Sequence, residues 1–135
     1  MAIKVANEGG ALTLGGICQC PSYLDNAGKE AVQHEFRKQI KVFDENKLDF
    51  VLCEYFEHIE EMEWAIEVAK ATGMPVAASM CIGPLGDLHG VSAGECAVRM
   101  ARAGAHVGNQ DFSKIILPFC IIGLGLSLSW CQLPF

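Results

Sequence analysis

The sequence has 135 residues, of which 51% are hydrophobic, and a formal net charge of −6. This composition is typical of one folded domain, or of part of one, and not of a disordered chain. The negative charge, with no cluster of lysines or arginines to offset it, argues against a nucleic-acid-binding surface.

The first residues and the cysteines bear on cellular location. No apolar segment follows the opening MAIK, so no signal peptide is expected. The seven cysteines are odd in number and lie mostly in apolar segments, which is typical of reduced thiols. The sequence therefore predicts a cytoplasmic protein without a disulfide framework.

Short apolar strands are expected to alternate with amphipathic helices. Val32, Phe36, Ile40 and Phe43 recur at helical spacing and predict the longest helix. The run at 49–53 does not alternate in polarity, so it predicts a strand that is buried on both faces. The expected elements are helix 1–7, strand 11–17, a turn at 20–22, helix 29–46, strand 49–53, a helix from 59 to about 71, strand 76–82, helix 93–103 and a strand that starts at 105–108.

This alternation predicts an α/β fold. Strands joined through helices at this spacing run parallel, with right-handed crossovers. Either an α/β barrel or a doubly wound sheet satisfies the pattern. A barrel of this kind takes about 250 residues, so the chain would cover well under half of one.

The composition changes after residue 108. Residues 115–135 carry no charge and have no helical or strand period, and Pro118, Gly123, Gly125 and Pro134 interrupt them. We therefore predict a domain at 1–108 and a divergent hydrophobic tail at 109–135. About 20 apolar residues can span a bilayer, so a membrane anchor is one alternative. The favoured interpretation is a foreign tail from alternative splicing or a mispredicted gene end.

Glu54 and Tyr55 follow the apolar run at 50–53 and are the first candidate site. Open α/β sheets and barrels place ligands at the carboxyl ends of their strands. A carboxylate there can bind an ammonium group, and a tyrosine ring can hold a methylated cation. The alternative is that Glu54 pairs locally or caps the next helix. Because other glutamates already serve that helix start, Glu54 is redundant for the task.

Two further sets of residues have a functional and a structural interpretation. Asp87 and His89, in the loop after strand 76–82, are either an acid/base pair or part of the loop architecture, and we favour the latter. The thiols that end the strands are either a metal-binding cluster or inert buried groups, and we favour inert thiols. These thiols are Cys18, Cys20, Cys53 and Cys81.

Several of these stretches together resemble the betaine–homocysteine S-methyltransferases. The matching stretches are 15–24 (GGICQCPSYL), 54–58 (EYFEH), 80–84 (MCIGP), 86–90 (GDLHG) and 94–99 (GECAVR). The resemblance covers about residues 3–108. It implies a partial (β/α)8 barrel of about three β/α units.

The resemblance also implies a function. The family transfers a methyl group from betaine, or a related onium donor, to homocysteine, and depends on zinc. By resemblance, Glu54 holds the homocysteine amino group and Tyr55 walls the methyl-donor pocket. The family's zinc ligands lie beyond the match, and Cys96, Cys120 and Cys131 do not replace them. We therefore expect no catalytic residue and no metal ligand in this chain.

Two expectations follow for the chain as a whole. The first is a methyltransferase-family protein, binding homocysteine and a betaine-like donor by descent, that is inactive alone. The second is a truncated, non-catalytic product that acts by interaction, for example with full-length subunits, or as a tail-anchored membrane protein. Membrane association is the less favoured of these.

Overall fold

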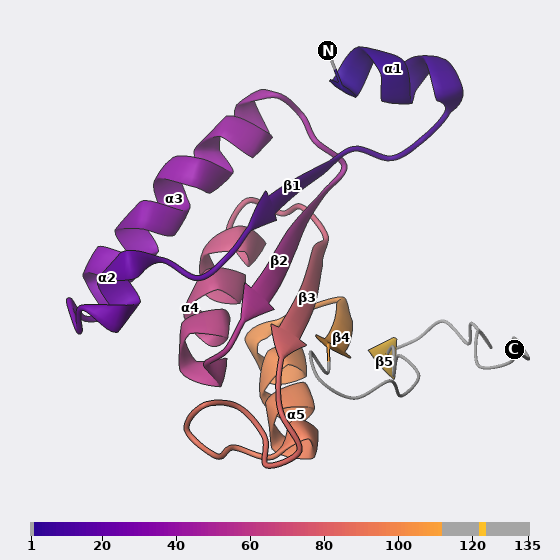
Figure 1. Cartoon of the computed structure of the whole chain (residues 1–135). Coiled ribbons are helices and arrows are strands. Elements are labelled where there is room, and N and C mark those ends of the chain that lie inside the picture. Colours follow the sequence, from indigo (N-terminus) through magenta and orange to yellow (C-terminus); the bar gives the residue numbers. More distant parts are fainter. Residues whose placement is uncertain (1, 112–121, 124–135) are drawn as a thin grey trace, which may run out of the picture.

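The computed structural model describes residues 2–111 and 122–123, and it confirms the alternation of helices and strands (Figure 1). The expected turn at 20–22 belongs to a short helix, α2, and the strand expected from residue 11 begins only at Leu14. The elements are α1 (Ala2–Gly9), β1 (Leu14–Ile17), α2 (Pro21–Leu24), α3 (Lys29–Glu45), β2 (Phe50–Phe56), α4 (Ile59–Lys70), β3 (Val76–Cys81), α5 (Ala93–Ala103), β4 (Val107–Asp111) and β5 (Ile122–Gly123).

The strand order separates the two α/β folds that the alternation allowed. The sheet runs β1-β2-β3-β4-β5, and the first four strands are parallel. Consecutive strands are neighbours throughout, whereas a doubly wound sheet reverses its order at a switch point. Right-handed crossovers in one constant direction place successive helices on the same face of the sheet. The four parallel strands therefore form part of a (β/α)8 barrel.

The two faces of the sheet differ in burial. Side chains that point toward the helices are buried, among them Ile17, Val51, Cys53, Ala78 and Met80. They pack against the apolar stripes of α3 and α4, which the spacing of the sequence predicted.

The opposite side, which we call the open face, consists of Leu14, Gly16, Phe50, Leu52, Ala77, Ser79 and Val107. None of these side chains is buried, and Phe50 and Leu52 are only half-buried. The expectation that strand 49–53 is buried on both faces is therefore wrong. The run does not alternate because both faces are apolar, but nothing among the described residues covers the open face.

Gly15 allows β1 to lie close to α3. A Cβ atom built at this position would overlap the ring of Phe43. The absence of a side chain at Gly15 therefore sets the distance between the first strand and its helix.

We expect Gly15→Ala to lower the free energy of unfolding by about 1–3 kcal/mol, because an added methyl group must displace Phe43. Urea unfolding gives the measurement. Gly94→Ala is the control, since a Cβ there meets nothing within 4 Å. It should leave stability unchanged or raise it by up to about 1 kcal/mol. Equal losses in the two variants would contradict this packing.

Candidate functional site

Glu54 and Tyr55 lie within β2, which continues to Phe56, three residues past the end that the sequence predicted. The two residues form an irregularity in the strand. The pairing of β2 with β3 shifts register between Cys53 and Phe56. Tyr55 has a φ of 61°, a left-handed conformation that is rare for an aromatic residue, and its side chain is 59% exposed. Bulges of this kind redirect side chains and are frequent beside functional sites.

The carboxylate of Glu54 lies on the open-face side of the sheet, at the carboxyl end of β2. A Cβ atom added at Gly16 of β1 would be 3.2 Å from its Oε1 atom, so the carboxylate reaches over the neighbouring strand. None of the described residues forms a hydrogen bond or ion pair with Glu54, and the N-cap of α4 is His58. The structure thus presents an exposed carboxylate, unpaired among the described residues, at the edge where barrel proteins bind ligands.

Asp87 holds the loop after β3 against the loop after β2. Its Oδ2 atom accepts a hydrogen bond from the Ile59 N–H at 3.0 Å, and its Oδ1 atom accepts from the His89 and Val91 N–H groups at 2.9 and 2.8 Å. The Leu88 N–H also donates to the Glu57 carbonyl at 3.0 Å. The loop-architecture interpretation of Asp87 is therefore confirmed.

The electrostatics of Asp87 agree with this role. Burial alone would raise its pKa, but the backbone N–H groups of Ile59, Val91 and His89 stabilise the carboxylate, and the net effect lowers the pKa. An ionised carboxylate whose two oxygens both accept hydrogen bonds from backbone N–H groups stabilises the loop and does not serve as a general acid.

His58 packs between two other rings at this edge. Its ring centroid lies 5.0 Å from that of Tyr23 and 4.4 Å from that of His89. Burial, followed by the nearby His89, lowers the pKa of His58, so the ring is neutral at pH 7. Its Nδ1 atom has no hydrogen-bond partner among the described residues. The three rings join the loops that follow β1, β2 and β3.

Glu61 is a buried carboxylate whose burial the sequence did not lead us to expect. The side chain is fully buried, and its Oε1 atom accepts a hydrogen bond from the Cys20 N–H at 2.7 Å. Burial raises the pKa of Glu61. One signal was present in the sequence, because Glu61 precedes the buried Ala65 and Val68 by four and seven residues and so belongs to the buried stripe of α4.

The described thiols do not fit the zinc site that the resemblance implies. Cys20 and Cys53 are buried, and burial raises their pKa values to about 11 and about 12, which disfavours the thiolate that zinc requires. Cys18, which follows β1, is exposed, and Cys81, at the end of β3, is half-buried. Among the described residues, no group of three or more His, Cys, Asp or Glu side chains is placed to hold a metal ion. We assign no chemical step to zinc here.

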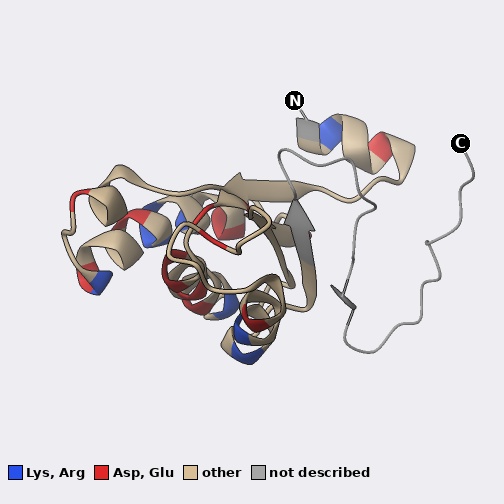
Figure 2. Cartoon of the chain, turned by 60° about the horizontal axis from the view of Figure 1, so that its bottom comes forward, with Lys and Arg blue, Asp and Glu red and all other residues tan. Residues whose placement is uncertain are grey.

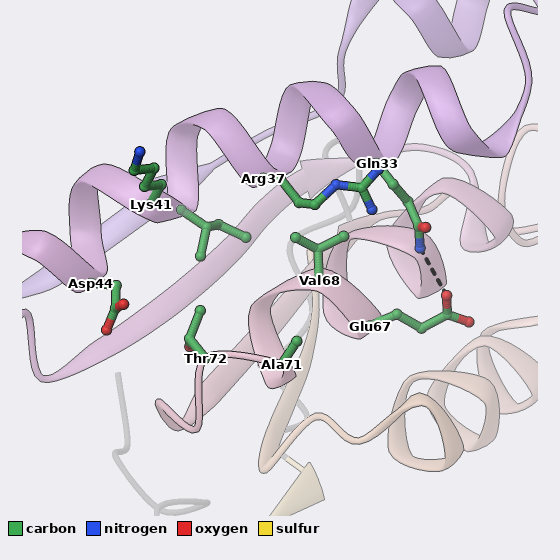
Figure 3. Close-up of a pocket in the computed structure, with 9 residues that line it drawn as sticks. Gln33, Arg37, Lys41, Asp44, Glu67, Val68, Ala71 and Thr72 are labelled. Atoms are coloured by element: carbon green, nitrogen blue, oxygen red, sulfur yellow. Dashed lines mark hydrogen bonds between the residues drawn. The ribbon is translucent and has the colours of Figure 1, made fainter.

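A groove of about 520 Å³ lies elsewhere, on the outer surface between α3 and α4 (Figure 3). Three of its charged side chains, Arg37, Lys41 and Glu67, already have partners. Gln33 Nε2 and Lys29 Nζ contact Glu67 at 2.8 and 2.7 Å, and Arg37 pairs with Glu30. The groove is separate from Glu54, and we assign it no ligand. It is lined by Gln33, Arg37, Ile40, Lys41, Asp44, Glu67, Val68, Ala71 and Thr72.

The fold and this edge define the class of protein, an α/β-barrel protein with an exposed carboxylate at the carboxyl end of its second strand. Comparison with known sequences gives the family. The profile described as Homocysteine S-methyltransferase matches residues 2–120, so the chain belongs to the homocysteine S-methyltransferase family.

Individual relatives point to one branch of this family. Betaine–homocysteine S-methyltransferase 1 of Danio rerio is 56% identical over 107 residues, which are 79% of this chain and 27% of the relative. The Xenopus laevis protein of the same name is 58% identical, with the same coverage. That of Sus scrofa is 54% identical and 38% covered. The chain therefore spans between about a quarter and two fifths of the length of these relatives.

The predicted tail at 109–135 falls largely outside the described residues, and the boundary at 108 stays a prediction. β4 itself continues to Asp111. Within residues 2–111 and 122–123, no helix is both long and apolar enough to cross a membrane.

We expect Asp87→Asn to lower the free energy of unfolding at pH 7 by about 1.5–3 kcal/mol, because three N–H donors lose a charged acceptor. The folded-state pKa of Asp87 is lowered, so its contribution is fully present above the unfolded pKa of about 3.9 and is lost as the pH falls through the folded value. The difference between wild type and variant should therefore shrink in acid.

Urea unfolding at several pH values measures this difference. Asp44→Asn, on the exposed side of α3, is the matched control and should change stability by less than about 0.5 kcal/mol. A deficit for Asp87→Asn that stays constant down to pH 2 would contradict the role of its charge.

Proposed function

We propose that this chain binds homocysteine and a betaine-like methyl donor as part of a betaine–homocysteine methyltransferase site. Glu54 binds the ammonium group of homocysteine, and Tyr55 forms a wall of the methyl-donor pocket. The observation that carries this proposal is the exposed Glu54 carboxylate, which has no partner among the described residues and lies over Gly16 at the carboxyl edge of the sheet.

The chemistry of the two ligands supports these assignments. The homocysteine ammonium group needs an anionic partner, and an exposed carboxylate supplies one without first breaking an existing ion pair. Betaine carries a quaternary ammonium group, which an aromatic face attracts through its quadrupole. Tyr55 is the exposed aromatic side chain beside Glu54, and the bulge holds it away from the core.

The proposed reaction is a direct displacement. The homocysteine sulfur, having lost its proton, forms a bond to a methyl carbon of the donor while the bond from that carbon to nitrogen breaks. The electron pair of the broken bond stays on nitrogen, and the donor leaves as a tertiary amine. Glu54 and Tyr55 would act by holding the two reactants in line, which lowers the entropic part of the barrier.

We further propose that the 135-residue chain does not catalyse this reaction alone. The support is chemical: the described thiols are not suited to the zinc that the resemblance implies, and Glu54 and Tyr55 bind and orient without activating the thiol. A cytoplasmic location is also proposed, supported by the five described cysteines, which are thiols.

We expect Glu54→Gln to weaken binding of L-homocysteine by about tenfold, because a charge-assisted contact is lost. Calorimetric or NMR titration of the purified chain measures this. 4-Mercaptobutanoate, which is homocysteine without its ammonium group, should bind wild type and variant equally. Glu57→Gln is the matched control variant and should bind homocysteine normally. Wild-type affinity of the Glu54→Gln chain for homocysteine would contradict the assignment of Glu54 to the ammonium group.

We expect the purified chain to form no methionine from betaine and homocysteine, even with zinc supplied. Methionine is measured by chromatography, with the Danio rerio relative as the positive control under the same conditions. Clear turnover by the chain alone would overturn the proposal that it is inactive, while leaving the Glu54 assignment to the binding experiment.

A further inference from the structure

Glu61 differs from most charged residues of this chain in its burial. Charged residues of both signs lie mainly along the helices (Figure 2), and most of them are exposed. The Glu61 side chain is fully buried instead, on the side of α4 that meets the loop after β1. A buried carboxylate loses its hydration, and this loss lowers stability unless hydrogen bonds replace it. Each of its two oxygen atoms therefore needs a donor.

One oxygen atom of Glu61 has a donor, and the other has none among the described residues. Oε1 accepts a hydrogen bond from the Cys20 N–H at 2.7 Å, whereas Oε2 is buried without a partner. Burial raises the pKa of Glu61, the Cys20 hydrogen bond opposes this rise, and the nearby Glu35 adds to it. The carboxyl group thus holds the loop after β1 while it remains only partly satisfied itself.

The other buried side-chain atoms of this kind lie in the two segments that Glu61 joins. Within the part of the chain that the structure describes, they are Gln19 Oε1, next to Cys20, and His58 Nδ1, at the start of α4. Tyr23, just after the loop, packs its ring against that of His58. Buried polar atoms without partners are uncommon, and functional sites are where folded proteins retain such features. Their concentration here favours a role in the site over a role in stability.

The loop that this carboxylate holds begins beside Glu54. β1 is paired with β2 as far as Ile17, which lies opposite the residue before Glu54, so the loop leaves the sheet level with Glu54. Only Cys18 and Gln19 lie between that last pair and Cys20. The hydrogen bond at Cys20 therefore fixes the path of a two-residue segment next to the Glu54 carboxylate.

We propose that Glu61 is a positioning residue for the homocysteine site, an inference that rests on the function proposed above. By accepting a hydrogen bond from the Cys20 N–H, Glu61 fixes residues 18–20 in one path beside Glu54. Homocysteine then meets a preformed wall and does not have to order the loop, which preserves affinity. Because Glu61 is fully buried, it acts through the loop and not by touching the ligand.

Two substitutions separate the hydrogen bond from the charge. Glu61→Gln keeps an oxygen that accepts from the Cys20 N–H, so the homocysteine affinity measured by titration should stay within about twofold of wild type. Glu61→Met fills a similar volume without a strong acceptor, and we expect it to bind homocysteine about tenfold more weakly. Its Cys20 amide should also exchange hydrogen about tenfold faster or more. Glu61→Leu replaces Glu61→Met if the latter does not fold.

Val68→Ala, on the same helix, is the matched control. Val68 is 7% exposed and lines the groove between α3 and α4, away from the loop after β1. The substitution should lower the urea midpoint of unfolding, because it leaves a cavity, but homocysteine affinity should not change. A loss of affinity in Glu61→Met that Val68→Ala does not share is therefore not a general effect of lower stability.

Wild-type homocysteine affinity of Glu61→Met would overturn the positioning role. Equal losses of affinity in Glu61→Met and Glu61→Gln, or in Glu61→Met and Val68→Ala, would overturn it as well. Absence of homocysteine binding by the wild-type chain would instead contradict the proposed function. The backbone NMR shifts of Gly16 and Glu54 then decide whether Glu61 positions the loop. They should change in Glu61→Met and not in Glu61→Gln, and unchanged shifts in both variants would contradict the inference.

Discussion

The carboxylate of Asp87 is the interaction on which the carboxyl edge of the sheet depends. It accepts hydrogen bonds from the first residue of α4 and from two residues of its own loop. Three donors on one buried anion keep it charged, and the charge in turn strengthens each bond. The loop after β3 is thereby fixed against the segment after β2, through the additional Leu88-to-Glu57 contact.

This brace explains how a strained residue can persist beside it. Tyr55 adopts a positive φ in the middle of a strand, a conformation that costs free energy and is retained only where the surroundings determine it. Before Tyr55 in the chain, Cys53 is paired with β3. After it, Phe56 is buried and paired with Met80. The consequence is that Glu54 and Tyr55 are presented to solvent in one arrangement, which is what a binding site requires.

The sequence predicted the elements, the parallel sheet and the loop role of Asp87, because periodicity and turn chemistry are local signals. It placed Glu54 just after a strand, whereas β2 continues to Phe56 through a bulge whose register depends on β3. The sequence spacing places Glu61 on the buried stripe of α4, but it could not show the hydrogen-bond partner of its carboxylate, the distant Cys20 N–H. Ligand identity came from family resemblance, since spacing alone contains no information about homocysteine.

The central claim is that the edge held by Asp87, and not another surface, is where the ligand binds. Backbone NMR shifts of the chain during titration with L-homocysteine test this most directly. We predict that Gly16, Glu54, Tyr55 and the loop that contains Asp87 shift together, while Arg37 and Glu67 in the groove between α3 and α4 stay unchanged. Shifts confined to that groove, or spread evenly over the helices, would contradict the account.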